Sequence, residues 1–550
     1  MPSDFEISRN IKLKPISEIA GSIGITQGHI IPYGHYFAKI DSALLTQLEG
    51  RKDGKLVLIT SMSPTPSGEG KTTLAIGLSQ SLKLLGKKVA ACLRQPSLGP
   101  YFGAKGGATG SGYSQVLPAE DIAIQFTGDD YAIVTAHNLI SSIIDNHIYH
   151  GNKLNIDPER ILWNRVSTVN DRSLRKVRIS EGKATGERVE EFHISAASEL
   201  MSILCLSNGL KDLKNRVGKI LLSYDKDGGP VTLKDLNING AVAALLKNAI
   251  HPNLVQSLEG VPVFVHGGPF GNISIGCNSL IATRLALKLS DFVLTEAGFA
   301  TELGAEKFFD IVSRAGGLKP SGAVVVVTLK ALRFHGGAKD YLRSDTEAIK
   351  KGMENLEKHL ENIRKYGIPL ICAINRYNDD TLEELNLAQK LIKELGAEAY
   401  IADVSGAGGK GGIEAAEAII KITEKSNDFK YLYDTELAIP EKIEKIAKEI
   451  YGADGVDYTD TAKADINDII RLGCSDLPIC IAKTPKSLSD DPALTGRPKG
   501  FRITVQRIRP ATGAGYLVAI CGSILLMPGL PEHPLAEHID IDDNGRIIGI

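Results

Sequence analysis

The chain has 550 residues, of which 63 are basic and 65 acidic, so its formal net charge at pH 7 is −2. A chain of this length is too long to fold around one ordinary hydrophobic core, and it predicts about three or four domains. The balanced charge argues against a protein that binds nucleic acid through a basic surface, and it favours a small polar substrate.

The cysteines and the N-terminal sequence bear on the compartment. Seven cysteines are scattered without a CxxC pair, and no histidine has the spacing of a zinc site. Such cysteines are typical of a reduced, cytoplasmic protein. The start, MPSDFEISRN, lacks the basic and apolar regions of a secretory signal, and the late apolar stretch YLVAICGSILLMPGL is too short to span a membrane. We therefore expect a cytoplasmic protein without a membrane or nucleic-acid partner.

Short apolar runs alternate with helical patterns along much of the chain. These runs are typical of buried parallel strands, and the helices between them are typical of a doubly wound sheet. We predict an α/β fold with a doubly wound, mostly parallel sheet and additional smaller α/β regions. The runs lie at 56–59, 89–93, 261–265, 292–294, 323–328 and 370–374.

Two charged helical stretches indicate where the regions of the chain change. One lies at 347–366, before the apolar run PLICAIN, and the other at 440–451, before the turn-rich GADGVDYTD. We expect a first domain over 1–345, a second α/β region over 346–455 and a C-terminal α/β region over 456–550.

The strongest functional motif is TPSGEGKTT, which lies between the first apolar run and a helical pattern from Thr72 to Leu85. A strand, a glycine loop and a helix in this order are typical of the P-loop, which binds nucleoside triphosphates. Thr65 replaces the first glycine of the pattern GxxxxGK[ST], whereas the end of the motif is intact. A glycine turn that merely begins a helix is the alternative, but the preceding strand favours a nucleotide site.

The residue types of this loop predict how it binds ATP. Backbone N–H groups can donate to phosphate oxygens, and Lys71 places a positive charge at the β and γ phosphates. The Thr72 hydroxyl can bind magnesium. The predicted nucleotide-binding residues are Thr65, Pro66, Ser67, Gly68, Glu69, Gly70, Lys71, Thr72 and Thr73.

Arg94 follows the second apolar run, in the sequence LRQPSLGP. Ligands of open α/β sheets bind at the carboxyl ends of the strands, so we expect Arg94 to face the γ-phosphate. An arginine there can bind a carboxylate or an acyl phosphate through two hydrogen bonds, and a structural ion pair is the alternative. The glycine-rich segment at 99–112 is either a mobile lid or an anion-binding loop.

Weaker signals follow other apolar runs. His266 and His335 each precede two glycines, but isolated histidines are more often hydrogen-bonded structural residues, so we assign them no chemistry. Phe299 and Tyr377 also lie at the ends of such runs. Spacing alone favours a place in the core for both rings.

The chain resembles the formate-tetrahydrofolate ligase family in long segments that run in the family's order from about residue 30 onward. The segments include TPSGEGKTT, LRQPSLGP, GAKGGATGSGYSQV, NLVQSLEGVPVFVHGGPFGNISIGCNS, TEAGFATELGAEKFFDI, YGADGVDYTD and MPGLPEHPLAE. The resemblance implies an enzyme of one-carbon metabolism that joins formate to tetrahydrofolate while ATP is converted to ADP and phosphate. The product implied is 10-formyltetrahydrofolate.

The resemblance also implies roles for individual residues. Formate attacks the γ-phosphorus of ATP and gives formyl phosphate, with Lys71 and Arg94 as catalytic residues and Arg94 holding the intermediate. Phe299 and Tyr377 flank the pterin of tetrahydrofolate, and Asp129 belongs to a site for a monovalent cation. On this view the first domain binds ATP and formyl phosphate, and the second region contributes to the folate site. A homotetramer is implied as well.

Two positions depart from the family's pattern. Gln95 stands where many members carry a glutamate that binds the monovalent cation, which puts potassium activation in question. The family's folate-stacking tryptophan is missing from VSGAGGKGG, where its nearest equivalent is about Gly406, and the only tryptophan of the chain is Trp163. One stacking wall is therefore expected to be absent.

Two other classes of P-loop protein are alternatives. A switch ATPase would carry a signature lysine five residues before the loop lysine, and Pro66 occupies that position. Another carboxylate- or carbamate-activating ligase, similar to dethiobiotin synthetase, would share the loop but not the long C-terminal segments. Both alternatives are therefore less favoured than the formate ligase.

Overall fold

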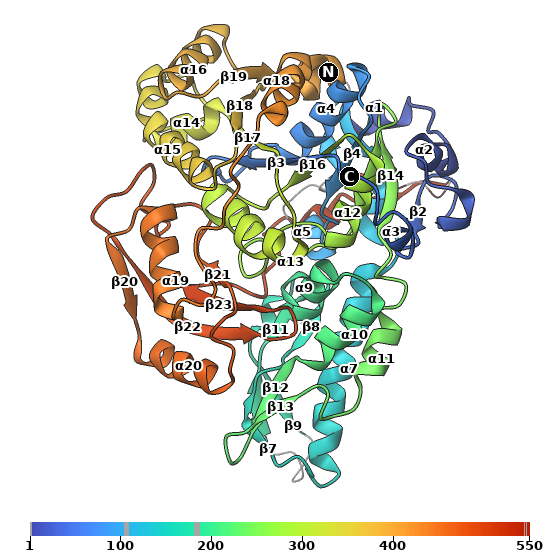
Figure 1. The fold of residues 1–550 in the computed structure, drawn as a ribbon, viewed down its shortest axis with the longest axis vertical. Helices are drawn as coiled ribbons and strands as arrows, with labels where there is room; N and C mark the ends of the chain where they lie inside the picture. Colours follow the sequence, from blue (N-terminus) through green and yellow to red (C-terminus); the bar gives the residue numbers. More distant parts are fainter. Residues whose placement is uncertain (1–2, 104–108, 181–186, 544, 546, 550) are drawn as a thin grey trace.

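The computed structural model describes residues 3–103, 109–180, 187–543, 545 and 547–549. A large mixed sheet of twelve strands forms its upper part in the view of Figure 1. A middle segment of the chain and a C-terminal sheet lie below this central sheet (Figure 1). None of the helices in the described ranges is long and apolar enough to cross a membrane.

The central sheet has the strand order β1-β2-β14-β15-β4-β16-β3-β17-β18-β19, with β6 paired to β14 and β5 paired to β6. From β15 to β19 in this order, each strand runs parallel to its neighbour, whereas the pairs at the other edge are antiparallel. The strands are β1 Ile30–Pro32, β2 Ala38–Ile40, β3 Lys55–Ser61, β4 Val89–Leu93, β5 Gly110–Ser111, β6 Ser114–Leu117, β14 Asn253–Ser257, β15 Pro262–Val265, β16 Phe292–Glu296, β17 Gly322–Val327, β18 Leu370–Asn375 and β19 Ala399–Ala402.

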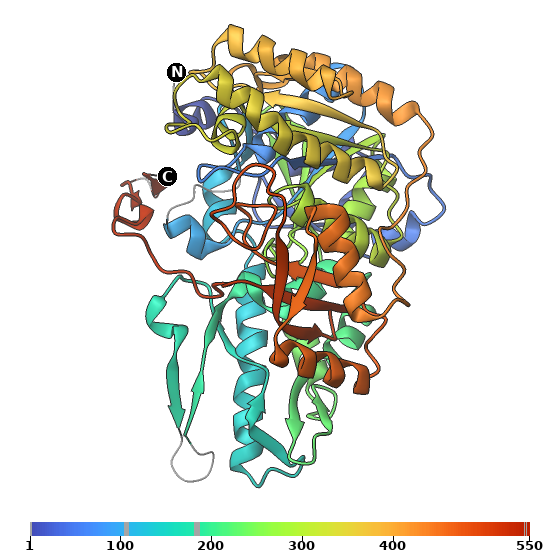
Figure 2. The ribbon, with the colours of Figure 1, turned by 90° about the vertical axis from the view of Figure 1, so that its left-hand side faces the viewer.

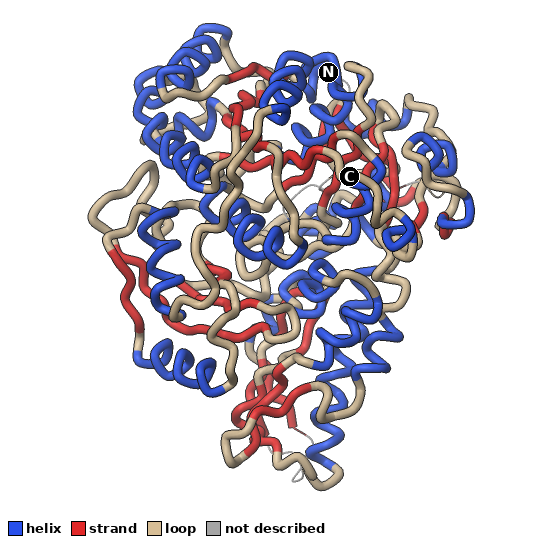
Figure 3. The backbone as a smooth tube through the Cα atoms, viewed as in Figure 1, coloured by secondary structure: helices blue, strands red, loops and turns tan. Residues whose placement is uncertain are grey.

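Helices cover both faces of this sheet (Figure 3), because successive side chains of a strand point to opposite sides. Along β17, Val324 and Val326 belong to the core on one face, and Val325 and Val327 to the core on the other. The first face is covered by α4 Lys71–Leu84 and α18 Ile413–Glu424. The second is covered by α12 Leu280–Leu289, α14 Leu329–His335, α15 Thr346–Lys365 and α16 Leu382–Glu394.

The sequence-based expectations for this sheet are confirmed in their main points. Each predicted apolar run coincides with one of its strands to within one residue at each overrun end, since 261 and 328 lie just outside β15 and β17, and the α/β class with a mostly parallel central sheet is correct. The helix predicted from Thr72 is α4, and Gly86, with a φ of 76°, follows its end. β18 and β19, which lie in the region expected to begin at 346, continue the sheet of the first region.

The middle of the chain forms an elongated extension, coloured cyan and green in Figure 1 and seen from the side in Figure 2. Its helices are α7 Asp129–Tyr149, α9 Glu199–Leu206, α10 Leu210–Gly218 and α11 Asn239–Leu245. Its strands are β7 Ile156–Ile161, β8 Arg165–Ser167, β9 Val177–Ser180, β10 Glu187–Glu190, β11 Phe192–Ile194, β12 Leu221–Asp225 and β13 Pro230–Thr232.

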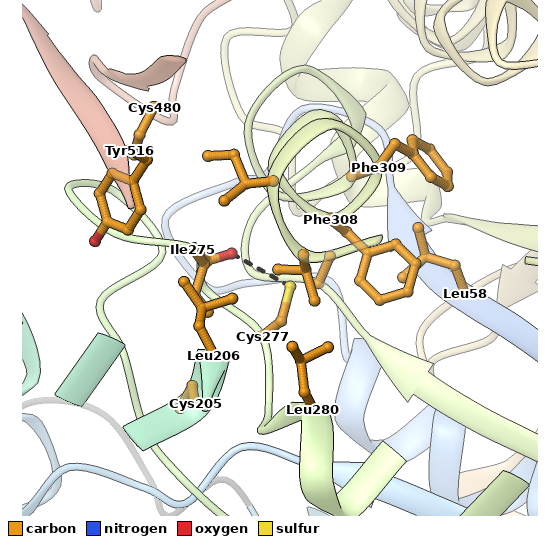
Figure 4. Close-up of a cluster of buried hydrophobic side chains, with 14 of the residues drawn as sticks. Leu58, Cys205, Leu206, Ile275, Cys277, Leu280, Phe308, Phe309, Cys480 and Tyr516 are labelled. Carbon is orange, nitrogen blue, oxygen red and sulfur yellow. Dashed lines mark hydrogen bonds between the residues drawn. The ribbon is translucent and has the colours of Figure 1, made fainter. Parts of the chain in front are cut away.

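The C-terminal sheet has the order β20-β22-β23-β21. Its strands are β20 Gly455–Tyr458, β21 Ile479–Ala482, β22 Arg502–Ala511 and β23 Tyr516–Cys521, and α19 Ile439–Ile446 and α20 Asp460–Arg471 accompany them. Figure 4 shows where this sheet meets the rest of the protein: Leu58 of β3, Leu206 of α9 and Tyr516 of β23 belong to one hydrophobic core. The three parts are therefore joined by continuous apolar packing.

Candidate functional site

The glycine loop, residues 64–70, connects the carboxyl end of β3 to the start of α4. Gly68 and Gly70 have φ angles of 79° and 70°, which other residues rarely adopt, so the loop needs glycine at both places. Thr65 replaces the usual first glycine for a local reason. Its backbone N–H and its hydroxyl both donate to Oε1 of Glu69, at 2.6 and 2.9 Å.

Glu69 supports the loop from inside the protein. Its side chain is buried, and its Oε2 accepts a hydrogen bond from the hydroxyl of Thr328, which follows β17. Asn375, at the end of β18, donates from Nδ2 to the backbone carbonyl of Glu69 at 3.1 Å. The side chain of Glu69 is therefore turned away from the loop's outer surface, and only its backbone can contact a nucleotide there.

Lys71 lies at the first position of α4, and its side chain is half-buried. Its Nζ donates to Oγ of Ser61 at 3.4 Å, at the end of β3. Burial lowers the pKa of Lys71, while the carboxylates of Glu296 and Glu69 oppose that shift. The structure thus holds a half-buried cation at the base of the loop, close enough to two carboxylates for their charges to act on it.

Glu296 is a polar residue of this site that was not among the predicted site residues. It ends β16, which lies between β4 and β3, and its Oε2 accepts a hydrogen bond from the Thr72 hydroxyl at 2.8 Å. Its Oε1 lies 3.9 Å from Nε of Arg94. An acidic residue at the carboxyl end of a parallel strand, in LTEAG, is a signal that would have identified it.

Arg94 follows β4 as predicted and lies beside the segment after β16. A Cβ atom on Gly298 would come within 3.2 Å of a terminal nitrogen of Arg94, and one on Gly271 would come within 3.1 Å of the Phe299 ring. Glycine at these positions lets the backbone approach both side chains. Phe299 has a φ of 61°, and its carbonyl accepts a hydrogen bond from Oγ of Ser61 at 3.0 Å. The structure therefore brings Arg94, Phe299 and the base of the loop together.

A model of the formate-tetrahydrofolate ligase family matches residues 2–550 of this chain. The formate-tetrahydrofolate ligase of Symbiobacterium thermophilum is 50% identical to it over 555 residues, and the match covers 100% of both chains. The chain belongs to the formate-tetrahydrofolate ligase family. It is a ligase that joins formate to tetrahydrofolate at the expense of ATP. The two matches confirm the resemblance and exclude the two alternative classes.

Tyr377 lies on the other side of the loop of this ligase. Tyr377 follows β18, and Phe299 follows β16. Because β3 and β17 lie between these two strands, their ends are about 14 Å apart. The Tyr377 hydroxyl lies 3.4 Å from the place of a Cβ on Gly70, and Nζ of Lys330 lies 4.2 Å from the centre of its ring. The two rings thus stand on opposite sides of the loop instead of forming a close pair.

The residues present do not fit a monovalent cation at Asp129. The ammonium of Lys39 lies 2.8 and 3.0 Å from the two carboxylate oxygens of Asp129, and Nδ2 of Asn253 donates to the same carboxylate at 2.8 Å. Lys39 is only 1% exposed, so this ion pair is buried. The charge of Lys39 already neutralises the Asp129 carboxylate. In addition, no group of three or more His, Cys, Asp or Glu side chains suited to a metal occurs in the part of the chain described.

The segment near Gly406, where the resemblance places the missing ring, contacts Asp403 and Ser111. The N–H of Gly406 donates to Oδ1 of Asp403, and a Cβ there would lie 2.5 Å from that oxygen, so a side chain at this position would displace the carboxylate that caps the segment. Its neighbour Ser405 instead contacts Ser111 through the two hydroxyls at 3.4 Å, and Ser111 contacts Thr73 of α4 at 3.2 Å. Ser405 is therefore linked to the start of α4 through Ser111.

The other residues that the sequence singled out have structural contacts. His266 is buried between Oγ of Ser279 and the carbonyl of Ala249, and burial lowers its pKa to about 4. Trp163 stacks on His137 with ring centres 4.0 Å apart. Residues 104–108 of the predicted lid lie outside the described residues, so the lid stays a prediction.

Proposed function

We propose that the reaction of this ligase takes place around Lys71, Thr72 and Arg94, at the carboxyl ends of β3 and β4. One observation supports this most directly: Glu296 contacts the Thr72 hydroxyl and lies next to Arg94, so the predicted phosphate-binding and formate-binding groups share one site. In the same proposal, the central sheet is a doubly wound P-loop fold, and the glycine loop binds the phosphates of ATP.

The first step transfers the γ-phosphoryl group of ATP to formate. An oxygen of formate attacks the γ-phosphorus as the bond to the leaving ADP oxygen breaks, which gives formyl phosphate and ADP. Loop N–H groups and the Lys71 ammonium stabilise the charge that develops on the phosphoryl oxygens. The Thr72 hydroxyl would hold the magnesium ion of Mg-ATP, which would neutralise part of the phosphate charge.

Formyl phosphate solves a chemical problem that formate alone presents. An amine that attacks the carbon of formate would have to expel an oxide ion, whereas an amine that attacks formyl phosphate expels phosphate. Arg94 can hold the acyl phosphate through two parallel hydrogen bonds. Its Nε has no hydrogen-bond acceptor among the described residues, so this donor is available to an anionic ligand.

The second step transfers the formyl group to the amine at position 10 of tetrahydrofolate. We propose that Phe299 and Tyr377 contact the pterin, each from its own side of the glycine loop. Because water would hydrolyse the mixed anhydride, the site must exclude it during the reaction. The predicted lid after Arg94 is part of the proposal for this reason.

Further features of the proposal rest on the family. The ligase acts as a cytoplasmic homotetramer, with ATP and formate bound by residues 1–345, a contribution to the folate site from 346–455, and a smaller α/β region at 456–550. No step is assigned to a monovalent cation, because Lys39 occupies the carboxylate of Asp129.

Product analysis tests the function and its order of steps. Purified protein is incubated with ATP, formate and tetrahydrofolate, each omitted in turn, and ADP, phosphate and 10-formyltetrahydrofolate are measured. We expect folate formylation only in the complete mixture, and ATP cleavage only when formate is present. ATP cleavage at an equal rate without formate would contradict the formyl phosphate route.

A further inference from the structure

Glu296 occupies a central place in the site because of its strand. β16 runs parallel to both of its neighbours: Glu296 pairs with Ile59 of β3, and Thr295 pairs with Cys92 of β4. The glycine loop follows β3 in the chain, and Arg94 follows β4. A side chain at the end of β16 is therefore placed between the two groups that bind ATP and formyl phosphate.

The two oxygens of the Glu296 carboxylate differ in their contacts. Oε2 accepts the Thr72 hydroxyl at 2.8 Å, whereas Oε1 is buried and has no hydrogen-bond donor among the described residues. The Nε of Arg94, at 3.9 Å, is too far for a hydrogen bond. A buried carboxylate oxygen without a donor is costly, so a missing polar partner is expected at Oε1.

Glu69, on the other side of the loop, shows what a purely structural glutamate of this site contacts. Its Oε1 accepts two hydrogen bonds from Thr65, and its Oε2 accepts one from Thr328. Both of its oxygens are thus bound by the protein itself. Glu296 differs, because it binds the predicted magnesium ligand with one oxygen and leaves the other without a donor.

We propose that Glu296 completes the magnesium site of this ligase. Oε2 orients the Thr72 hydroxyl so that its oxygen can bind the ion, and Oε1 accepts a hydrogen bond from a water molecule bound to the ion. Magnesium favours oxygen ligands, keeps several of its waters and is commonly held by one or two carboxylates together with substrate phosphates. The inference deepens the proposed function, since it concerns the ion that accompanies ATP.

The alternative is that Glu296 serves only as an ion-pair partner of Arg94. A charge-assisted hydrogen bond between an arginine and a carboxylate is usually about 2.7–2.9 Å long. The separation of 3.9 Å, with neither facing atom hydrogen-bonded to any described residue, does not match that geometry. This alternative also gives no reason for the direct contact between Glu296 and Thr72.

The test measures binding of Mn²⁺, a paramagnetic substitute for magnesium, in the presence of ADP. Free Mn²⁺ is counted by electron paramagnetic resonance for the parent and for Glu296→Gln, which keeps an oxygen acceptor for Thr72 but removes the charge. We expect the variant to bind Mn²⁺ about 10- to 100-fold more weakly. The variant should bind metal-free ADP at least as tightly as the parent does, because it has lost a negative charge near the ADP phosphates.

Glu302→Gln is the matched control. Glu302 is also fully buried, both of its oxygens lack a hydrogen-bond donor among the described residues, and its charge acts on Lys71, but it has no contact with Thr72. We expect its affinity for Mn²⁺ to equal that of the parent. Three results would overturn the proposal. They are an equal loss of Mn²⁺ affinity in both variants, an unchanged Mn²⁺ affinity in Glu296→Gln, and a loss of affinity for metal-free ADP in Glu296→Gln as large as its loss for Mn²⁺.

A second variant secures the test against misfolding. Melting temperatures without nucleotide show whether each variant is folded. If Glu296→Gln is not, Glu296→Asp replaces it, since it keeps the charge but withdraws both oxygens, and Mn²⁺ affinity equal to the parent's would then overturn the proposal. Because formate and folate are absent from these titrations, the result does not depend on whether the proposed reaction is correct.

Discussion

The two sides of the glycine loop are built differently. On the side of β17 and β18, Glu69 is fully hydrogen-bonded by Thr65 and Thr328, and Asn375 holds the loop backbone. On the side of β16 and β4, Glu296 and Arg94 each retain a buried atom without a hydrogen-bond partner among the described residues. One side therefore fixes the shape of the loop, and the other keeps polar groups available for ligands.

The largest expected effect on turnover is on the available side. Arg94→Lys keeps the positive charge but loses the planar pair of donors that an acyl phosphate requires. We expect turnover to fall about 100-fold, as for the loss of one oxyanion donor, with the melting temperature unchanged. Steady-state kinetics and nucleotide titration measure this. A loss within about twofold, or about 0.4 kcal/mol, would show that Arg94 is only structural.

The next effect is on the fixed side. Glu69→Ala leaves the Thr65 amide and the Thr328 hydroxyl without their acceptor, at a cost of about 3 kcal/mol in unfolding free energy, and it loosens the loop. We expect a lower melting temperature and weaker binding of ADP. Thr328→Ser, which keeps the hydroxyl, is the control and should resemble the parent. If Glu69→Ala lowers turnover while stability and ADP affinity stay intact, Glu69 belongs to the reacting side.

Tyr377→Ala tests whether a ring on the fixed side also serves a substrate. Stacking of a flat ring system on an aromatic side chain contributes about 1–3 kcal/mol, so tetrahydrofolate should bind about 5- to 150-fold more weakly. Because the Tyr377 hydroxyl lies near Gly70, we expect a smaller loss of ATP affinity as well. Tyr377→Phe should restore folate binding. An unchanged folate constant in the alanine variant would place Tyr377 in the core alone.

Local sequence patterns predicted one part of the site and missed another for a physical reason. The strand before TPSGEGKTT, the helix after it and Arg94 at the end of β4 follow from periodicity and from where parallel sheets bind ligands. The contact between Thr72 and Glu296 joins residues 224 positions apart. Hydrophobic periodicity shows which face of a strand is buried, but it does not show which polar side chains meet across two loops.

The segment near Gly406 gives the same lesson at closer range. Resemblance placed the missing tryptophan at about Gly406, but only the structure shows that a side chain there would displace the carboxylate of Asp403. Lys39 likewise gave no signal, because a lysine between apolar residues in AKI has no visible partner until α7 brings Asp129 to it. In both cases the decisive information is a contact between different elements.

A ring placed at Ser405 should therefore act differently from one at Gly406. Ser405→Trp adds a ring at the position linked to the start of α4 through Ser111, and we expect it to tighten tetrahydrofolate by up to about tenfold, at the low end of the stacking energy. Gly406→Trp should lower the melting temperature without improving folate binding. Folate titrations and melting curves distinguish the two, and tighter binding by Gly406→Trp alone would identify Gly406 as the equivalent of the family's tryptophan.

The smallest expected effect concerns monovalent cations. Because the ammonium of Lys39 already neutralises Asp129, and because Gln95 adds no charge, replacing sodium by potassium at constant ionic strength should change neither turnover nor melting temperature beyond error. Lys39→Met should reverse this: it leaves a buried carboxylate uncompensated, which costs about 3–5 kcal/mol, and opens space beside Asp129 and the His251 carbonyl. Potassium should then raise the melting temperature of the variant more than sodium does. Potassium activation of the parent chain would instead mean that a cation binds without using the carboxylate that Lys39 holds.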